Sequence, residues 1–131
     1  QEVEQVVRQL RDAGVRAIAV CFLHSFTNPA HEQRVKAIAL RIAPELSISL
    51  SSEVLGEIRE YERTVATVLN ACVMPMVGSY LGAIEDGLRA IGLNATLHIM
   101  QSNGGVISRE LGERMPIRML ESGPAAGAGM L

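Results

Sequence analysis

Residues 15–23 read VRAIAVCFL, a nearly unbroken apolar run. A strand that is apolar on both faces is typical of a parallel sheet covered by helices on either side. Residues 46–51 read LSISLS, which has the alternating period of a strand with one more polar face. Between these runs, Asn28 and Pro29 supply the N-cap and first position of a helix that extends to Ala43. The pattern predicts a right-handed β–α–β crossover with parallel strands.

The residues on either side of this unit read mainly as helix. The chain opens in a helix that stops at Ala13-Gly14. A short helical piece is predicted over residues 55–60, followed by a long helix over residues 61–91. Pro75 lies inside the long helix, so we expect a kink there or two helices that meet.

Beyond Gly92, the sequence indicates a second α/β segment. Strands are predicted over residues 96–100 and 117–120. Ser108 is expected to cap a short helix between them. A last helix is predicted over residues 125–131.

Composition describes a globular protein and excludes some partners. The chain has 131 residues, of which 48% are hydrophobic and 20% charged, with a formal net charge of −2. It has no basic run that could neutralise a phosphate backbone, so nucleic acid is not expected as a partner. We find no apolar stretch of the ~18 residues that span a bilayer and no signal peptide, so we expect no membrane and a cytoplasmic location. The two cysteines are expected to be buried, reduced thiols.

The loop over residues 101–105, QSNGG, is the first candidate for binding chemistry. It follows a predicted strand directly, where open α/β sheets hold their ligands. Its paired glycines, Gly104 and Gly105, allow backbone N–H groups to approach an anion, and Ser102 and Asn103 add polar side chains. The alternative is a tight turn made of ordinary turn residues.

Two further stretches carry alternatives of the same kind. Ser122 and Gly123 lie at a predicted helix start, which is either an anion site or a helix start followed by a small-residue contact face. Tyr61, Glu62 and Arg63 lie in a dense cluster of charges that is either a solvated helix face or the wall of an interdomain cleft.

Other common sites are disfavoured. The histidines and cysteines lack the spacing of a metal site, so no metal ligands are predicted. The only two aspartates, Asp12 and Asp86, lie in or beside helices, whereas a magnesium–nucleotide site normally uses aspartates at strand ends. The chain has no Gly-Lys-Ser or Gly-Lys-Thr phosphate loop.

The order of several motifs resembles the hydantoinase A/5-oxoprolinase family. The stretches that carry the resemblance are VCFLHSFTNPAHE (20–32), LSSEVL (50–55), EIREYERT (57–64), VLNA (68–71), MQSNGG (100–105) and ESGPAAG (121–127). The resemblance implies part of a two-domain ribonuclease-H-like fold, as in the actin and sugar-kinase superfamily, with ATP and magnesium in the cleft between the domains. It places residues 1–55 at the end of the first domain, 56–92 in linking helices and 93–131 at the start of the second domain.

The resemblance also implies a function. Members are ATP-dependent enzymes that open cyclic amides such as hydantoins and 5-oxoproline, or nucleotide-using subunits of acetone-type carboxylases. A hydantoinase B-type subunit or domain is the implied partner. The family's Asp-x-Gly-Gly-Thr phosphate motifs have no counterpart here, so we expect a central piece of a larger hydrolase that is inactive alone. The alternatives are the carboxylase subunit and a non-catalytic docking module.

One expectation concerns the isolated chain. The apolar positions of residues 61–91 spread around much of the predicted helix. We therefore expect the isolated chain to self-associate, through this helix or through residues 96–131.

Overall fold

The structure, a computed structural model, describes residues 1–120, 122, 123 and 127. Contacts divide the chain into two compact units, unit 1 (Gln1–Cys72) and unit 2 (Val73–Leu131). Helix α4 (Glu60–Ala90) contributes residues to both units. The division into residues 1–55, 56–92 and 93–131 stays a prediction.

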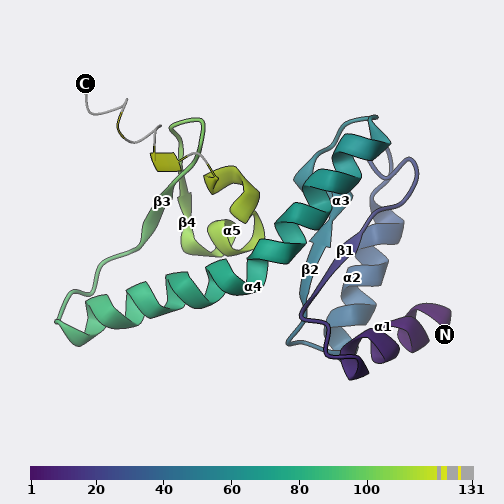
Figure 1. The fold of residues 1–131 in the computed structure, drawn as a ribbon, viewed down its shortest axis with the longest axis horizontal. Coiled ribbons are helices and arrows are strands. Elements are labelled where there is room, and N and C mark those ends of the chain that lie inside the picture. The colour runs from purple at the N-terminus through teal and green to yellow at the C-terminus, as the bar shows by residue number, and fades with distance from the viewer. Residues whose placement is uncertain (121, 124–126, 128–131) are drawn as a thin grey trace. The chain divides into compact units, whose positions relative to one another are not determined.

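Unit 1 contains the predicted β–α–β crossover (Figure 1). Strands β1 and β2 pair in parallel, with Ala17 opposite Ser47 and Val20 opposite Leu50. This pairing confirms the prediction made from the two apolar runs. The elements before α4 are α1 (Glu2–Asp12), β1 (Ala17–Val20), α2 (Ala30–Ile42), β2 (Ser47–Leu50) and α3 (Ser51–Val54).

Local sequence explains how these elements begin and end. Gly14 follows α1 with a φ of 79°, a left-handed conformation that glycine adopts without strain. Asn28 accepts a hydrogen bond from the backbone N–H of Ala30 at 3.1 Å, in a turn that precedes α2. The N-cap position of α2 is Pro29 and has no side-chain capping bond, so the start predicted from Asn28 and Pro29 lies one residue too early.

The core of unit 1 lies between the helices α1 and α2 and one face of the sheet. Ile48 and Leu50 of β2 point into it, and Ser49 points to the opposite face, as the alternation in the sequence predicts. That opposite face is covered as well, because Asn70 of α4 donates to Ser49 Oγ at 3.0 Å. The buried core residues are Val7, Val20, Ala39, Ala43, Leu46, Ile48 and Leu50.

Three predictions for unit 1 are wrong in detail. The cysteines are not both buried, since Cys21 is half-buried and Cys72 is exposed. Strand β1 covers four residues, and beyond it Phe22 and Leu23 are 41% and 71% exposed, so the apolar run is not buried throughout. The helix predicted over residues 55–60 is replaced by α3, which starts directly after β2. The backbone returns to an extended conformation at Leu55, with φ −146° and ψ 98°.

Helix α4 runs from Glu60 to Ala90 with Pro75 inside it, so the alternative of two separate helices is wrong. An 18-residue window of α4 has a mean hydropathy of 1.4. By length and composition alone, the helix is therefore long and apolar enough to cross a membrane. The expectation that no stretch reaches this limit is therefore also wrong. A single such helix is weak evidence for a membrane protein, since core helices of soluble proteins meet the same criterion.

Unit 2 is built on an antiparallel pair, β3 (His98–Met100) and β4 (Val106–Ser108). Ser108 then accepts the N–H of Leu111 and begins α5 (Arg109–Arg114), as predicted. Strand β4 was not predicted. Residues 117–120 are not the predicted strand, because Pro116 starts a short 3-10 helix, η1 (Pro116–Met119). The helix predicted over residues 125–131 lies, apart from Gly127, outside the described residues.

Candidate functional site

The carboxyl ends of β1 and β2 meet at a buried carboxylate, Glu32, in the first turn of α2. Glu32 Oε1 accepts the N–H of Phe22 at 2.9 Å, just beyond β1. It also accepts the hydroxyl of Ser51 at 2.6 Å. Glu32 Oε2 accepts the N–H and the hydroxyl of Ser52 at 2.9 and 2.7 Å, just beyond β2. One side chain therefore ties together the segments that follow both parallel strands.

Hydrogen bonds keep Glu32 ionised although its side chain is fully buried. Burial by itself raises the pKa of Glu32, but the donors on Ser51, Ser52 and Phe22 together outweigh it and hold the pKa below the ordinary value. All of these donors prefer the charged carboxylate. Because its oxygens are occupied by four hydrogen bonds, Glu32 is suited to positioning and not to general-base catalysis.

A buried arginine holds the same region from α4. The side chain of Arg63 is 1% exposed and donates from Nη1 to the carbonyl of Glu57 at 2.9 Å. From Nη2 it donates to the carbonyl of Phe22 at 3.0 Å. Its guanidinium also lies over the ring of Phe26, 5.5 Å from the centroid. Among the described residues, Arg63 Nε has no hydrogen-bond partner.

The segment that follows Phe22, which Glu32 and Arg63 both contact, has an unusual backbone. His24 has a φ of 56°, a left-handed conformation that is uncommon for a residue other than glycine. The hydroxyl of Ser25 is 2.9 Å from that of Ser51 and extends the network around Glu32. A small cavity of about 180 Å³ adjoins this network, and it is lined by Phe22, Leu23, Ser25, Asn28, His31 and Glu32.

Three predicted site residues in unit 1 are not brought together. Tyr61 is 78% exposed and Glu62 is also exposed, whereas Arg63 points into the unit. Glu62 Oε1 instead lies 3.7 Å from Nη1 of Arg59, and both side chains are exposed. Such an ion pair is typical of a solvated helix face. Their place at an interdomain cleft stays a prediction.

The loop over residues 101–105 forms the turn between β3 and β4, and it uses many of its own donors. The N–H of Gly104 donates to the carbonyl of Gln101, and that of Gly105 donates to Asn103 Oδ1 at 2.9 Å. Ser102 donates its N–H and hydroxyl to the carbonyl of Arg118 at 2.8 and 2.9 Å. Gly104 has a φ of 81°, which the turn requires. This geometry favours the tight-turn alternative over an anion-binding loop.

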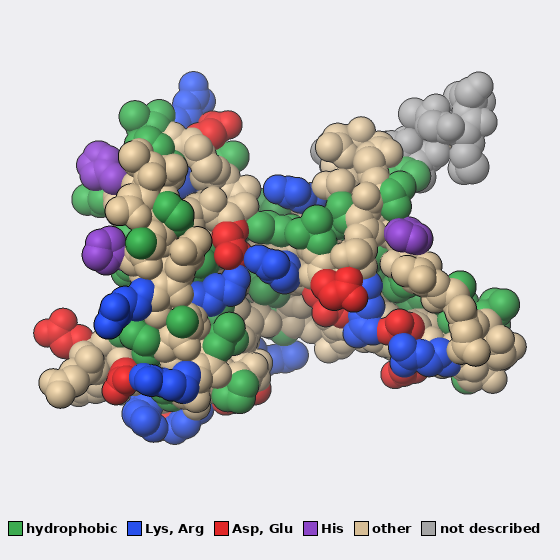
Figure 2. All heavy atoms as spheres, turned by 180° about the vertical axis from the view of Figure 1, so that it is seen from behind, with side chains coloured by type: hydrophobic (Ala, Val, Ile, Leu, Met, Phe, Trp, Pro, Cys, Tyr) green, Lys and Arg blue, Asp and Glu red, His purple; other side chains and the backbone are tan. Residues whose placement is uncertain are grey.

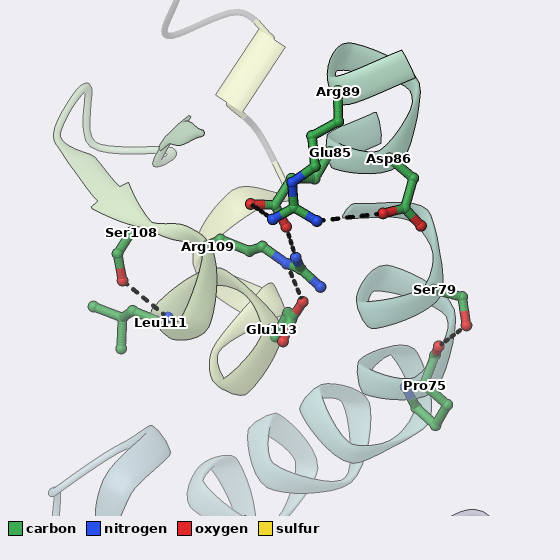
Figure 3. A network of polar contacts seen from close by, with 9 residues as sticks. All are labelled: Pro75, Ser79, Glu85, Asp86, Arg89, Ser108, Arg109, Leu111 and Glu113. Carbon is green, nitrogen blue, oxygen red and sulfur yellow. Dashed lines mark hydrogen bonds and ion pairs between the residues drawn. The ribbon is translucent and has the colours of Figure 1, made fainter. Parts of the chain in front are cut away.

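A second polar cluster lies in unit 2, where Arg109 of α5 contacts two glutamates (Figure 3). Arg109 pairs with Glu85 of α4 and with Glu113 at 2.6 Å, and Arg89 pairs with Glu85 at 3.0 Å. A cavity of about 520 Å³ opens beside this cluster. Each cation already has a carboxylate partner, so the cluster is suited to joining α4 to α5.

Of the predicted site residues near the end of the described chain, Ser122 is half-buried and Gly123 is exposed.

The described residues do not favour a metal centre or a nucleic-acid interface. Among them, no three His, Cys, Asp or Glu side chains are grouped to hold a metal ion. On the face shown in Figure 2, positive and negative side chains are interspersed and not separated into a patch of one sign. We therefore regard the network of buried polar side chains around Glu32 and Arg63 as the candidate functional site of unit 1.

A parallel β–α–β unit with polar side chains at the carboxyl ends of its strands, followed by a long helix and a second α/β unit, defines a mixed α/β protein. Two sequence profiles specify the family. The one described as "Hydantoinase/oxoprolinase" matches residues 63–131, and that of the "Hydantoinase/oxoprolinase N-terminal region" matches residues 1–43. The chain belongs to the hydantoinase/oxoprolinase family, as its motifs predicted.

Curated relatives include enzymes of two kinds. The chain is 32% identical to the caprolactamase subunit alpha of Pseudomonas jessenii over 95% of its length, which is 18% of that protein. It is 36% identical to the acetophenone carboxylase gamma subunit of Aromatoleum aromaticum over 97% of its length, again 18% of the relative. It is 35% identical to the 5-oxoprolinase of Saccharomyces cerevisiae over 95% of its length and 9% of that protein. The chain thus spans less than a fifth of the length of these relatives.

Solved structures confirm the predicted fold class. The ATP-dependent caprolactamase of Pseudomonas jessenii matches with a TM-score of 0.85 and 32% identity, over 95% of this chain and 18% of the other. Nucleotide-free acetone carboxylase matches with a TM-score of 0.75 and 25% identity, over 96% of this chain and 18% of the other. The parallel pair and the long helix are therefore parts of a fold shared with both enzymes.

The sequence did not single out the residues of the Glu32 network. Glu32, Ser25 and Ser51 lie within the motifs that carry the family resemblance, yet none was assigned a role. A glutamate in the first turn of a helix is ordinary, since it favours the positive end of the helix dipole. Its complete burial depends on tertiary contacts with residues 10 to 20 positions away in sequence.

Proposed function

We propose that this protein is part of an ATP-dependent enzyme that opens the ring of a cyclic amide. The observation that carries the proposal is the likeness to ATP-dependent caprolactamase, with a TM-score of 0.85 and 32% identity over 95% of the chain. The 5-oxoprolinase relative supports the same class, because both names describe enzymes acting on a cyclic amide.

Within such an enzyme, we propose that unit 1 acts as a rigid support. Glu32 and Arg63 fix the backbone that follows β1, and Glu32 also fixes the start of α3 after β2. Ligands of open α/β sheets bind at the carboxyl ends of the strands. The network holds this edge in one conformation, which reduces the motion of any loop that faces a substrate or nucleotide.

The described residues do not fit a magnesium–ATP site. Asp12 pairs with Arg11 at 2.8 Å, and Asp86 lies 3.6 Å from Arg89. Neither aspartate follows a strand, where a phosphate-bound magnesium ion is normally coordinated. We therefore propose that ATP and magnesium are held by residues outside these 131, and we assign no catalytic step to this chain.

A carboxylase is the second candidate, and a specific observation favours it. The acetophenone carboxylase gamma subunit is 36% identical to this chain, and acetone carboxylase shares its fold. Both this relative and the caprolactamase relative are named as subunits. We accordingly propose a partner subunit for this protein, of the hydantoinase B type. Hydantoin utilisation and a cytoplasmic location stay predictions.

One assay separates the two candidates. The protein expressed from the gene that contains this sequence, together with its partner subunit, is incubated with MgATP and each of hydantoin, 5-oxoproline and caprolactam. Parallel reactions contain bicarbonate with acetone or acetophenone. Ring-opened product that depends on ATP supports the hydrolase, and ATP-dependent carboxylation of a ketone supports the carboxylase. A protein that consumes ATP with none of these substrates would contradict both.

A further inference from the structure

The backbone of His24 is held in its left-handed conformation from the side of β1. Its φ of 56° is one that a residue with a Cβ keeps only where surrounding contacts enforce it. Two residues earlier, Glu32 accepts the N–H of Phe22 and Arg63 donates to its carbonyl. Both of these charged side chains are 0–1% exposed. The chain therefore enters the position of His24 from a peptide that two buried charges hold in place.

Contacts on the other side of His24 enforce the same conformation. The carbonyl of His24 accepts the N–H groups of Thr27 and Asn28 at 3.0 and 3.1 Å. The next residue, Ser25, is 2% exposed, and its hydroxyl lies 2.9 Å from that of Ser51. Strained residues that are enforced in this way cluster at active sites and ligand clamps. A turn with no other role is satisfied by glycine, which adopts this conformation without strain.

The side chain that this frame presents is an exposed imidazole. His24 is exposed, and its ring centroid lies 6.1 Å from that of Phe26. The loop that contains it follows β1, and Val20 at the end of β1 pairs with Leu50 at the end of β2. Open α/β sheets bind their ligands at this edge. His24 is therefore placed where a ligand of the intact enzyme is expected.

The surroundings of His24 favour a neutral ligand over a phosphate group. The sequence has no Asp, Glu, Lys or Arg from Ala17 to His31. Arg63 is buried, and its guanidinium donates to two backbone carbonyls. Phosphate sites rely on cations that can reach the ligand. Beside His24, Phe22 and Leu23 are 41% and 71% exposed, which suits a small molecule with methylene groups and one polar group.

We propose that His24 positions the cyclic amide by donating a hydrogen bond from its imidazole to the carbonyl oxygen of the ring. The methylene groups of the ring then lie against Phe22 and Leu23. A neutral imidazole always has one N–H donor, and an amide oxygen is a good acceptor. The inference rests on the function proposed above and assigns a substrate contact to a residue of this chain. Glu32 and Arg63 act on the substrate only through the backbone that they hold.

The test measures the KM of the intact enzyme, together with its partner subunit, for ATP and for a cyclic amide that the wild type opens. His24→Asn removes the imidazole and keeps the backbone, because asparagine adopts the left-handed conformation more readily than most residues. The KM for the amide is expected to rise about tenfold, as for the loss of one hydrogen bond, and the KM for ATP to change less than about twofold. His98→Asn is the matched control, since His98 is an exposed histidine of β3, and it should change neither constant.

A second variant separates substrate binding from a structural role. His24→Gly relieves the backbone strain, so its thermal unfolding temperature is expected to be no lower than that of the wild type. It is expected to raise the KM for the amide as much as His24→Asn does. A residue that served only the fold would change the unfolding temperature and the KM together.

Several results would overturn the proposal. One is a KM for the amide that His24→Asn leaves within twofold of the wild-type value, and another is an equal rise in His98→Asn. A rise in the KM for ATP alone would assign His24 to the nucleotide, and a lowered unfolding temperature in both His24 variants would make its role structural. A wild type that opens no cyclic amide would instead overturn the proposed function, and this inference with it.

Discussion

Glu32 and Arg63 hold the two backbone polar groups of one residue, Phe22. The carboxylate of Glu32 accepts its N–H at 2.9 Å, and the guanidinium of Arg63 donates to its carbonyl at 3.0 Å. Both charged side chains are buried, and a buried charge is costly unless hydrogen bonds satisfy it. The peptide groups around Phe22 thus lie between opposite charges that come from α2 and α4.

Glu32→Gln is expected to destabilise unit 1 by about 2–4 kcal/mol. The amide replaces one acceptor oxygen with an NH₂ group, so in either orientation one backbone N–H, that of Phe22 or that of Ser52, loses its acceptor. Urea denaturation of the chain followed by circular dichroism measures the change. Glu45→Gln is the control, because Glu45 is exposed, and it should change stability by less than about 0.5 kcal/mol. Equal effects of the two substitutions would contradict the role of Glu32.

The stability that Glu32 contributes is expected to depend on pH. Its pKa is lowered in the folded protein, since the hydrogen bonds outweigh the effect of burial. The contribution is therefore fully present above the unfolded pKa of about 4.3 and is lost as the pH falls through the folded value. Denaturation midpoints of the wild type and Glu32→Gln between pH 7 and pH 3 should converge at the acid end. A stability difference that stays constant over this range would show that the ionised carboxylate is not required.

Arg63→Met is expected to cost about 2–4 kcal/mol, because it removes the guanidinium donors to the carbonyls of Phe22 and Glu57. The carbonyl of Phe22 then keeps the longer hydrogen bond from the N–H of Ser25, at 3.4 Å. Arg63→Lys should recover only part of this loss, since an ammonium group cannot reproduce the planar fork of donors. Arg59→Met is the control, because the side chain of Arg59 is 70% exposed. Full recovery of the urea midpoint by lysine would mean that charge alone matters at this position.

Gly112→Ala is expected to be less favourable than Gly87→Ala by about 1 kcal/mol, because the ends of two flexible side chains must shift to make room for the new Cβ. A Cβ on Gly112 would lie 2.8 Å from Ile99 Cδ1 and 3.3 Å from Met119 Sδ. Gly87→Ala in α4 meets nothing within 4 Å, and it should stabilise by about 0.5–1 kcal/mol because alanine is the better helix former. Thermal unfolding of both variants gives the comparison. A Gly112→Ala variant that stabilises as much as Gly87→Ala would contradict the packing of α5 on β3.

Sequence predicted unit 1 well because its signals are local. The two runs over residues 15–23 and 46–51 and the Asn28-Pro29 start determine the strands, the helix and their parallel pairing. The residue at which a strand ends depends less on local sequence. Strand β1 ends at Val20 although the apolar run continues to Leu23. Where the chain leaves the sheet is decided by Glu32 and Arg63, which hold Phe22 from other elements.

In unit 2, short elements and glycine-rich turns gave weaker signals. The turn over residues 101–105 was predicted, but the strand after it was not, since three residues are too few to show a period. The candidate site was also not predictable from local sequence. Arg63 looked like one member of a surface charge cluster, and only the packing of α4 on the polar face of β2 buries it.

The 131-residue chain by itself is expected to show no ATP hydrolysis and no saturable binding of MgATP. Its two aspartates pair with arginines on helices and do not face a strand end. Isothermal titration calorimetry of the chain with MgATP checks this. A saturable isotherm with micromolar affinity would mean that the chain contains a nucleotide site that its described residues do not reveal.

The stoichiometry of the intact enzyme decides whether it couples ATP hydrolysis to the opening of a cyclic amide. ADP and ring-opened product are measured together after the protein and its partner subunit are incubated with MgATP and a cyclic amide. We predict that at least one of caprolactam, 5-oxoproline and hydantoin yields both products in a ratio near one to one, and neither when ATP or the amide is left out. Ring opening that proceeds equally well without ATP would contradict it.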